Sequence, residues 1–238
     1  MRKFIAAAML ALTALAAVPA QAADFPEYPE YPDIDVPDLP PADYGLGGSF
    51  YLRGSAAANV LHAREAVYGC ECGTIIDSGY GYSFGAGFGY ETGDGLRADF
   101  TVDQLVNKGL KATNGVDTFG LGLRSTLGLA NVYYDFGLSG YKKAHGGLGG
   151  YVGAGIGAAY NYSAISSGCD CIVDEGTQIS AAGALMAGVT YDMGSAVADL
   201  GYRMIYMPTI TNQAALTPYY VNNNVFHEVR GTLRYRFN

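Results

Sequence analysis

Long runs in which apolar side chains alternate with small or polar ones dominate this chain. In GYGYSFGAGFGYETGDG, residues 79–95, the even positions from Tyr80 to Tyr90 are aromatic or alanine, and the odd positions from Gly81 to Gly89 are glycine or serine. A period of two is typical of a β-strand, because successive side chains point to opposite faces. One face of this strand is therefore apolar and the other nearly bare.

The same alternation recurs in eight runs along the chain. They lie near 48–60, 80–91, 95–106, 122–136, 149–163, 178–192, 196–207 and 226–237. These runs exceed the average strand of about five or six residues and are long enough to cross a membrane when tilted. Their even number and their charged second faces predict an all-β fold, an eight-stranded antiparallel transmembrane β-barrel with lipid outside and a polar lumen. A soluble β-sandwich is the alternative.

The segments between the runs alternate in length. We expect short turns on the periplasmic side at 92–94, 137–148 and 193–195, and longer extracellular loops at 61–79, 107–121, 164–177 and 208–225. The fourth run is irregular, because Phe119, Leu121 and Leu123 are apolar at odd positions before the apolar phase moves to even ones. This predicts either a bulge within 125–128 or a longer second loop.

Charged residues on the polar faces predict an ion-pair network inside the barrel. An eight-stranded lumen is only wide enough for its own side chains to fill it. The residues expected there are Arg53, Arg97, Asp99, Asp103, Asp135, Asp199, Arg203, Glu228, Arg230, Arg234 and Arg236. We interpret the network as structural, with an ion- or proton-conducting path as the alternative.

The N-terminal residues predict export from the cytoplasm. Residues 1–22 have Arg2 and Lys3 before an apolar stretch and end in AQA, which is typical of a signal peptide cleaved between Ala22 and Ala23. Residues 23–46 are acidic and rich in proline, which interrupts helices and sheet ladders, so we expect an extended periplasmic tail. The tail is a spacer or a docking peptide, and the barrel is expected over residues 47–238.

A glycine motif within the fifth run raises an alternative function. Gly153, Gly155 and Ala158 have the spacing G-x-G-x-x-A, and Glu175 lies twenty residues beyond Gly155. A dinucleotide-binding turn needs its glycines between a strand and a helix, and here the period of two continues through the motif. We therefore expect the glycines at 153, 155 and 157 to leave room in the lumen for arginines of neighbouring strands.

Neither catalysis nor nucleic-acid binding is expected. The chain has three histidines, His62, His145 and His227, and none has the H-x-S arrangement of the lipid A deacylases. A nucleophilic site would need a serine or threonine, a histidine base and an acid that orients it. The formal net charge is −8 and there is no basic stripe, so nucleic acid is not an expected partner. No cofactor or metal is expected either.

Two paired cysteine motifs lie in predicted extracellular loops. GCEC contains Cys70 and Cys72, and GCDC contains Cys169 and Cys171. Four thiolates can hold zinc, but the spacing is narrow and the compartment is oxidising, so disulfides are favoured. Four cysteines allow three connectivities. We favour pairing between the two loops over pairing within each C-x-C motif.

Several of these runs resemble a known family. SFYLRGSAA, LANVYYDFG, YVGAGIGAAY, ALMAGVTYDMG, VADLGYRMIY and HEVRGTLRYRF look like segments of the small alphaproteobacterial porin-family or opacity-type proteins, which are related to the OmpA and OmpX barrels. The resemblance covers about residues 47–238. It implies a monomeric barrel in the outer membrane of a Gram-negative bacterium, inserted by the barrel-assembly machinery, with Phe237 as the C-terminal insertion signal although Asn238 follows it.

The resemblance and the composition together predict a role in the envelope. We expect contacts with outer-membrane lipid and lipopolysaccharide, and aromatic girdles built from tyrosine and phenylalanine, because the chain has no tryptophan. The expected function is a non-enzymatic barrel that supports envelope integrity and presents surface loops to a host or surface ligand, as adhesins and surface antigens do. The alternative is a narrow porin.

Overall fold

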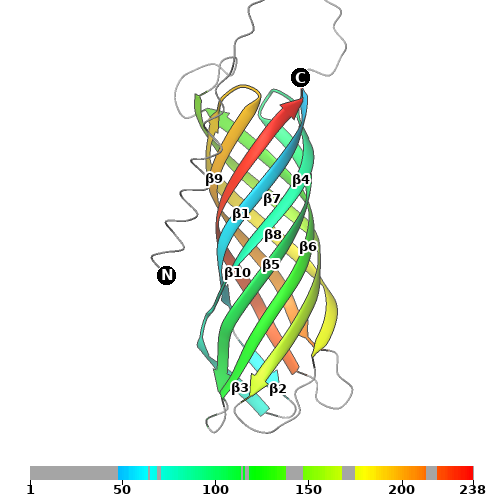
Figure 1. Cartoon of the computed structure of the whole chain (residues 1–238), viewed down its shortest axis with the longest axis vertical. Coiled ribbons are helices and arrows are strands. Elements are labelled where there is room, and N and C mark those ends of the chain that lie inside the picture. Colours follow the sequence, from blue (N-terminus) through cyan, green and yellow to red (C-terminus); the bar gives the residue numbers. More distant parts are fainter. Residues whose placement is uncertain are drawn as a thin grey trace, which may run out of the picture. The chain divides into compact units, whose positions relative to one another are not determined.

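The fold is known from a computed structural model, and it consists of β-strands (Figure 1). The structure describes residues 48–63, 65–68, 71–113, 115, 118–137, 147–167, 175–212 and 219–237. The predicted signal peptide, with Ala22 and Ala23 at its cleavage site, and the predicted tail lie outside the described residues. The strands are β1 (Ser49–His62), β2 (Glu65–Tyr68), β3 (Glu71–Asp77), β4 (Gly79–Glu91), β5 (Leu96–Thr113), β6 (Thr118–Gly137), β7 (Gly147–Ser167), β8 (Gly176–Asp192), β9 (Ala196–Thr211) and β10 (Tyr219–Phe237).

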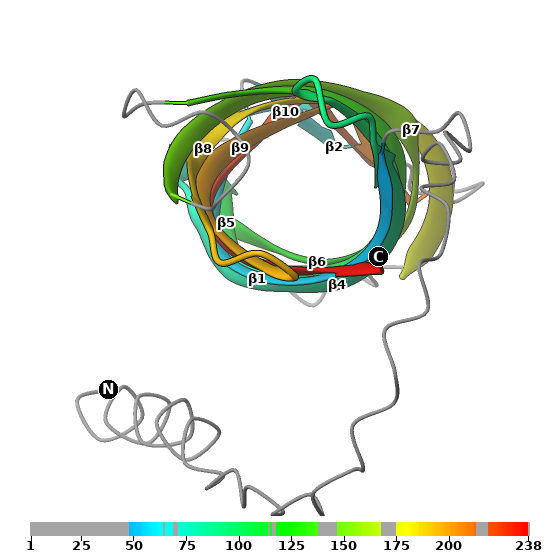
Figure 2. The same cartoon turned by 90° about the horizontal axis from the view of Figure 1, so that it is seen from above.

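The strands close into a barrel, seen along its axis as a ring in Figure 2. β1 pairs with β4 on one side and with β10 on the other, and β4 to β10 continue the wall through β5, β6, β7, β8 and β9. Every one of these pairings is antiparallel. Closure joins the first and last strands of the wall. The prediction of an antiparallel β-barrel is confirmed, and the two packed sheets of a sandwich are not formed by the described strands.

The first hairpin of the barrel is interrupted and longer than predicted. β2 pairs with β10, as β1 does, and β3 pairs with β5, as β4 does. β2 therefore continues the line of β1, and β3 continues the line of β4. The ten described strands thus form an eight-stranded barrel in which two of the strands are interrupted. The segment 61–79, predicted as a loop, thus contains a β2–β3 hairpin, which lies at the end of the barrel opposite the C terminus (Figure 1).

The prediction of a second long loop at 107–121 is wrong. β5 runs to Thr113 and β6 begins at Thr118, so strand occupies most of that segment. The reason is a bulge at Gly109, which has a φ of 96° and stands where the β5–β6 register shifts. A glycine accepts this conformation without steric cost, and the alternation resumes beyond it.

The bulge predicted within 125–128 is also wrong. β6 keeps a single phase along its length, with Leu121, Leu123, Ser125 and Leu127 all buried. The apparent shift of phase arises because apolar leucines, and not polar residues, face the interior in this part of the strand. The register between β6 and β7 is likewise uninterrupted from Phe119↔Ser167 to Gly137↔Gly149.

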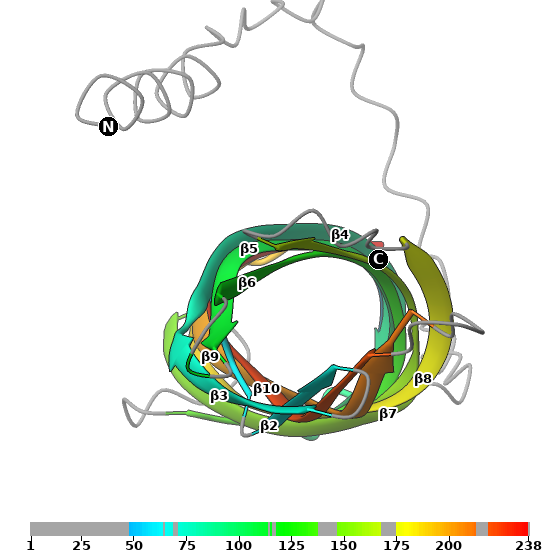
Figure 3. The same cartoon turned by 90° about the horizontal axis from the view of Figure 1, so that it is seen from below.

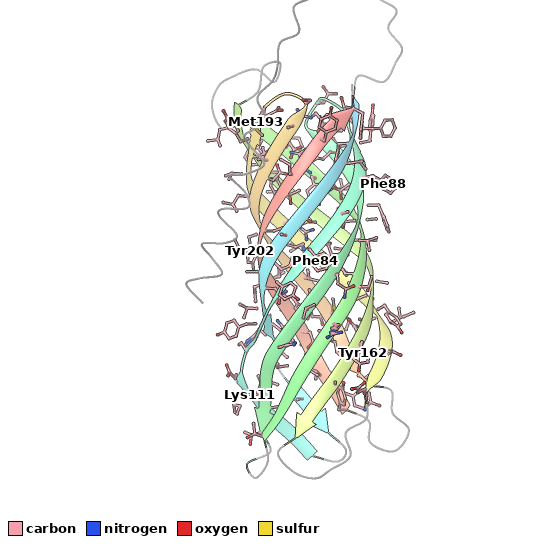
Figure 4. All side chains as sticks on the ribbon, in the orientation of Figure 1. Phe84, Phe88, Lys111, Tyr162, Met193 and Tyr202 are labelled. Carbon is pink, nitrogen blue, oxygen red and sulfur yellow. The ribbon has the colours of Figure 1, made fainter. Side chains whose placement is uncertain are left out.

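Two short turns and the end of the last strand gather at one end of the barrel, called here the turn end. The turns connect β4 to β5 and β8 to β9, and they contain Gly93, Gly95 and Gly194 with positive φ. Figure 4 labels Met193 at this end. The opposite end, with the β2–β3 hairpin, is called the hairpin end and faces the viewer in Figure 3.

The outer face of the wall is an apolar belt. Large side chains such as Phe84, Phe88 and Tyr202 project outward from it (Figure 4) and are well exposed. Near the turn end, the rings of Phe50 and Tyr90 lie 5.0 Å apart and those of Tyr235 and Phe237 lie 5.4 Å apart. Such a belt with an aromatic margin is the surface that a barrel presents to lipid.

The described residues contain no helix that is both long enough and apolar enough to span a membrane.

Candidate functional site: the barrel interior

The interior of the barrel has two zones. Charged side chains come from the turn-end parts of the strands, for example Arg97 early in β5 and Arg234 late in β10. Uncharged side chains come from the hairpin-end parts, most of them apolar, for example Leu61 late in β1 and Leu121 early in β6, with buried polar ones such as Asn161 of β7 among them. The strand alternation directs both sets inward, so the position along each strand decides the zone.

The structure brings all eleven predicted charged residues together in the first zone, the ion-pair network. Its salt bridges are Arg53–Asp99 at 2.7 Å, Arg97–Asp135 at 2.8 Å, Arg203–Asp103 at 2.8 Å, Arg203–Glu228 at 2.6 Å, Arg234–Asp199 at 2.9 Å and Arg230–Asp103. Arg236 pairs with Asp192 at 2.7 Å. Each arginine therefore has a carboxylate partner on another strand.

Two members of the network were absent from the prediction. Glu91, at the end of β4, pairs with Arg234 at 3.3 Å and with Arg236. Asp192, at the end of β8, pairs with Arg236. Both continue the inward phase of their strands, so extending the alternation by one step finds them, whereas the ETGDG segment that begins at Glu91 is predicted as a turn.

Neutral polar groups complete the coordination of the buried carboxylates. The Tyr51 hydroxyl donates to Asp99 at 2.9 Å, Asn131 Nδ2 donates to the other oxygen of Asp99 at 2.8 Å, and Ser83 donates to Glu228 at 2.7 Å. Burying charge is costly unless ion pairing and hydrogen bonding are both satisfied. These donors therefore offset part of the cost of placing the network away from water.

The glycines of β7 make room for an aromatic ring and not for arginines, contrary to expectation. A Cβ at position 153 would lie 2.3 Å from Cδ1 of Tyr133, and one at 155 would lie 2.0 Å from the side-chain oxygen of Asn131. Arg97 then stacks on the Tyr133 ring, with its guanidinium carbon 3.9 Å from the ring centroid. The close approach of Tyr133 to β7 thus positions one arginine of the network indirectly.

The glycine motif lies within one continuous strand. β7 extends on both sides of it, from Gly147 to Ser167, so the strand-to-helix turn of a dinucleotide site is absent there. Glu175 is exposed just before β8 and accepts a hydrogen bond from Tyr162.

The second zone, the apolar layer, corrects the prediction of a polar lumen throughout. It belongs to one buried cluster, whose hairpin-end members are Leu61, Leu105, Leu110, Leu121, Leu123, Leu127, Leu129, Ile205, Met207, Ile210, Tyr219, Val221 and Phe226. Leu105, Leu127 and Leu129 are each 0% exposed. These residues come from β1, β5, β6, β9 and β10, and buried neutral polar side chains lie among them, because Asn107 donates to Asn59 at 2.7 Å and Ser125 donates to Asn161 at 2.6 Å. Apolar and neutral polar side chains together therefore pack this part of the lumen.

The histidines and cysteines do not enter the interior site. His62 is exposed, and His227 is hydrogen-bonded to Tyr202 on the outer wall. His145, Cys70, Cys169 and Cys171 lie outside the described residues, and Cys72 belongs to β3. The cysteine pairing stays a prediction. Within the described ranges, no group of three or more histidine, cysteine, aspartate or glutamate side chains is arranged to hold a metal ion.

These features define the class of protein. A closed barrel satisfies its backbone hydrogen bonds between strands, and only helices and closed barrels do so across a bilayer. The apolar belt, the aromatic margin and the filled lumen are those of an integral β-barrel of the Gram-negative outer membrane. Short turns face the periplasm in such barrels, so the turn end is the periplasmic end.

Comparison with solved structures finds small outer-membrane β-barrels. Neisserial surface protein A (NspA) is 23% identical, with a TM-score of 0.48, and the match covers 80% of this chain and 99% of that chain. OprG of Pseudomonas aeruginosa is 18% identical, with a TM-score of 0.48 and coverage of 81% and 97%. Ail, the attachment invasion locus protein of Yersinia pestis, is 14% identical, with a TM-score of 0.43 and coverage of 80% and 99%. No protein-family model and no curated protein matches the chain.

Proposed function

We propose that this protein is a closed, non-enzymatic barrel that supports envelope integrity and presents surface loops, in the manner of an adhesin or surface antigen of the opacity type. The apolar layer is the observation that carries the proposal. An ion that crosses the lumen would leave water and enter a part packed with buried side chains that offer it no free charge, among them Leu105, Leu127 and Leu129, which are fully buried. Moving an unpaired charge into such surroundings carries a large free-energy cost. The barrel is therefore closed to ions and polar solutes.

Planar-bilayer recording of the purified protein tests the closed state. We expect no discrete conductance steps. A matched variant replaces Leu123, Leu127 and Ile205 with serine, which makes the layer hydrophilic while leaving the ion-pair network intact. If the unaltered protein conducts in reproducible steps, the alternative of a narrow porin takes the place of this proposal.

The hairpin end supports a role in surface presentation. β2 and β3 extend the wall beyond the end of β1, so the described part of the first loop forms a pair of antiparallel strands. A receptor on a host cell or another surface would meet this end, because the turn end faces the periplasm. Cell-binding assays with a variant in which residues 65–77 are replaced by a short Asn-Gly turn test the role; binding equal to that of the unaltered protein would contradict it.

A basic cluster on the outer wall supports contact with lipopolysaccharide. Nine lysine and arginine residues are described, and those outside the lumen are Lys108, Lys111 and Arg124. Lys108 stands opposite Gly122 and Lys111 opposite Gly120, and a glycine offers no side chain to cover either lysine. Lys111 lies 4.0 Å from Asp77 in an exposed pair. Figure 4 places Lys111 near the hairpin end, where lipid phosphates of the outer leaflet would lie.

Lipopolysaccharide retention tests this contact. Substituting Lys108, Lys111 and Arg124 with glutamine should weaken retention in detergent and reduce its salt dependence, because exposed charges are screened by salt. Thr126→Gln, on the same outer face of β6, is the matched control. Equal retention by the triple variant and the control would remove the cluster from the proposal. Incubation with lipid A and mass spectrometry tests the absence of catalysis, and loss of acyl chains would contradict it.

A further inference from the structure

The wall of the barrel has a slot between β8 and β9. Their hydrogen-bonded register runs from Asp192↔Val197 to Gly183↔Tyr206, and it does not continue in the described residues beyond that pair. Both strands nevertheless go on, β8 to Gly176 and β9 to Thr211, each paired with its other neighbour. Figure 3 shows the yellow end of β8 on the outer side of the ring. The two strands therefore separate toward the hairpin end.

Pro208 explains where the strands separate. Proline has no N–H to donate to a ladder and is confined to strand edges and bulges. Pro208 stands opposite Asn223, which has a φ of 55° and is the described non-glycine residue with positive φ. Met207 and Ile210 are both buried although they are three residues apart, so β9 changes phase at the proline. These two irregularities lie next to the point where the β8–β9 register stops.

The slot is closed again at its outer end. Gln178 of β8 accepts a hydrogen bond from the Thr211 amide of β9 at 2.9 Å. Gly176 lies so close to Asn212 that a Cβ at position 176 would be 2.1 Å from the Asn212 carbonyl oxygen. The opening is thus bounded at both ends and does not result from fraying of the strands.

On the lipid side, the slot forms a groove of about 580 Å³. Its floor consists of small residues, Gly157, Ala181 and Gly183, and its walls of Ile156, Tyr206 and Pro208. Ile156 is 75% exposed, and Ile179, further along β8, is 70% exposed. The groove is therefore continuous with the apolar belt and opens to membrane lipid. Its volume lies within the range of about 300–1,000 Å³ of ligand pockets.

We propose that this groove binds one acyl chain of a lipid of the outer leaflet. An acyl chain matches the apolar walls, and the groove lies in the hairpin-end half of the belt, which adjoins the outer leaflet. This binding site is independent of the proposed surface role.

Two matched glycine variants test the site. A Cβ at Gly183 would have no atom within 4 Å, so Gly183→Leu fills the groove without a backbone clash. Gly54, exposed on β1, is equally open, so Gly54→Leu adds the same side chain elsewhere on the belt. Native mass spectrometry should find one lipid on the unaltered barrel and on the Gly54→Leu variant, and none on the Gly183→Leu variant. Heat-modifiable gel migration checks that each variant is folded.

Tryptophan fluorescence gives a second readout, because the chain has no tryptophan. Ile156→Trp places a reporter at the groove, and Val152→Trp places one on the same outward face of β7, where β8 and β9 are paired. Phospholipid with brominated acyl chains should quench the Ile156→Trp variant saturably at one lipid per barrel and the Val152→Trp control only in proportion to bulk lipid. Equal quenching of both reporters, lipid retained by Gly183→Leu, or a dimer that this variant dissociates would each overturn the proposal.

Discussion

Arg203 and Asp103, one hundred residues apart in the chain, form a salt bridge of 2.8 Å in the middle of the lumen. The side chain of Arg203 is 3% exposed and that of Asp103 is 0% exposed. Asp103 also accepts a hydrogen bond from Arg230, so one carboxylate compensates two buried guanidinium groups. Loss of the Asp103 carboxylate would therefore remove a partner from both Arg203 and Arg230.

The first prediction is that Asp103→Asn destabilises the barrel strongly. Removing one partner of a buried pair leaves uncompensated charge and costs about 3–5 kcal/mol. Urea unfolding in lipid vesicles, followed by heat-modifiable gel migration, measures the change in free energy. Lys111→Gln, which breaks the exposed pair with Asp77, should cost at most about 1 kcal/mol. Equal losses for the two variants would show that burial of the network contributes nothing.

The second prediction concerns the contact between Gly153 and Tyr133. Gly153→Ala places a Cβ 2.3 Å from the Tyr133 ring, which must move and take Arg97 with it. Overpacking of this kind typically costs about 1–3 kcal/mol. Gly54→Ala, with open space around its Cβ, should be near neutral. Unfolding titrations of both variants decide the matter, and a neutral Gly153→Ala would mean that Tyr133 has room to shift.

Alternation along the chain is sufficient to predict which residues face the lumen, but not which arginine meets which acid. Arg203 finds Asp103 because β9 and β5 lie on different sides of the same small lumen, and no local pattern encodes that distance. The apolar layer escapes prediction for a different reason. Leu121, Leu123 and Leu127 have the correct inward phase. Because the inward face was expected to be polar, these apolar residues suggest a bulge that shifts the phase of the strand.

The limits of the strands and the slot between β8 and β9 could not be predicted from the sequence either. β5 continues past Gly109 because its neighbour β6 pairs with it on both sides of the bulge. Pro208 falls in a predicted loop, since proline normally ends a strand pairing. Only the register with β10 keeps β9 extended beyond it, and only the broken register with β8 shows the slot.

The third prediction concerns the cysteines. Pairing between Cys70 or Cys72 and Cys169 or Cys171 would enclose about a hundred residues, and the chain-entropy model then gives a stabilisation of nearly 5 kcal/mol. Peptide mapping without reduction should find peptides that link the first loop to the third. Reduction should lower the free energy of unfolding of the unaltered protein and leave a variant with all four cysteines changed to serine unaffected. Peptides linked only within each C-x-C motif would contradict pairing across the loops.

The fourth prediction separates the two faces of one strand. Leu127 faces the apolar layer and is 0% exposed, so Leu127→Ala should cost about 2–5 kcal/mol through lost contacts and the cavity that remains. Val132, on the outer face of the same strand, is 54% exposed, so Val132→Ala should cost much less. Val132→Arg should cost up to about 1 kcal/mol in a bilayer, because Val132 pairs with Ala98 close to the turn end and the penalty for charge on the lipid face is small near the interfaces. In detergent micelles, which hydrate such a residue more readily, the arginine penalty should fall while the Leu127→Ala penalty persists. Equal penalties for Leu127→Ala and Val132→Ala would contradict the assignment of Leu127 to a packed interior.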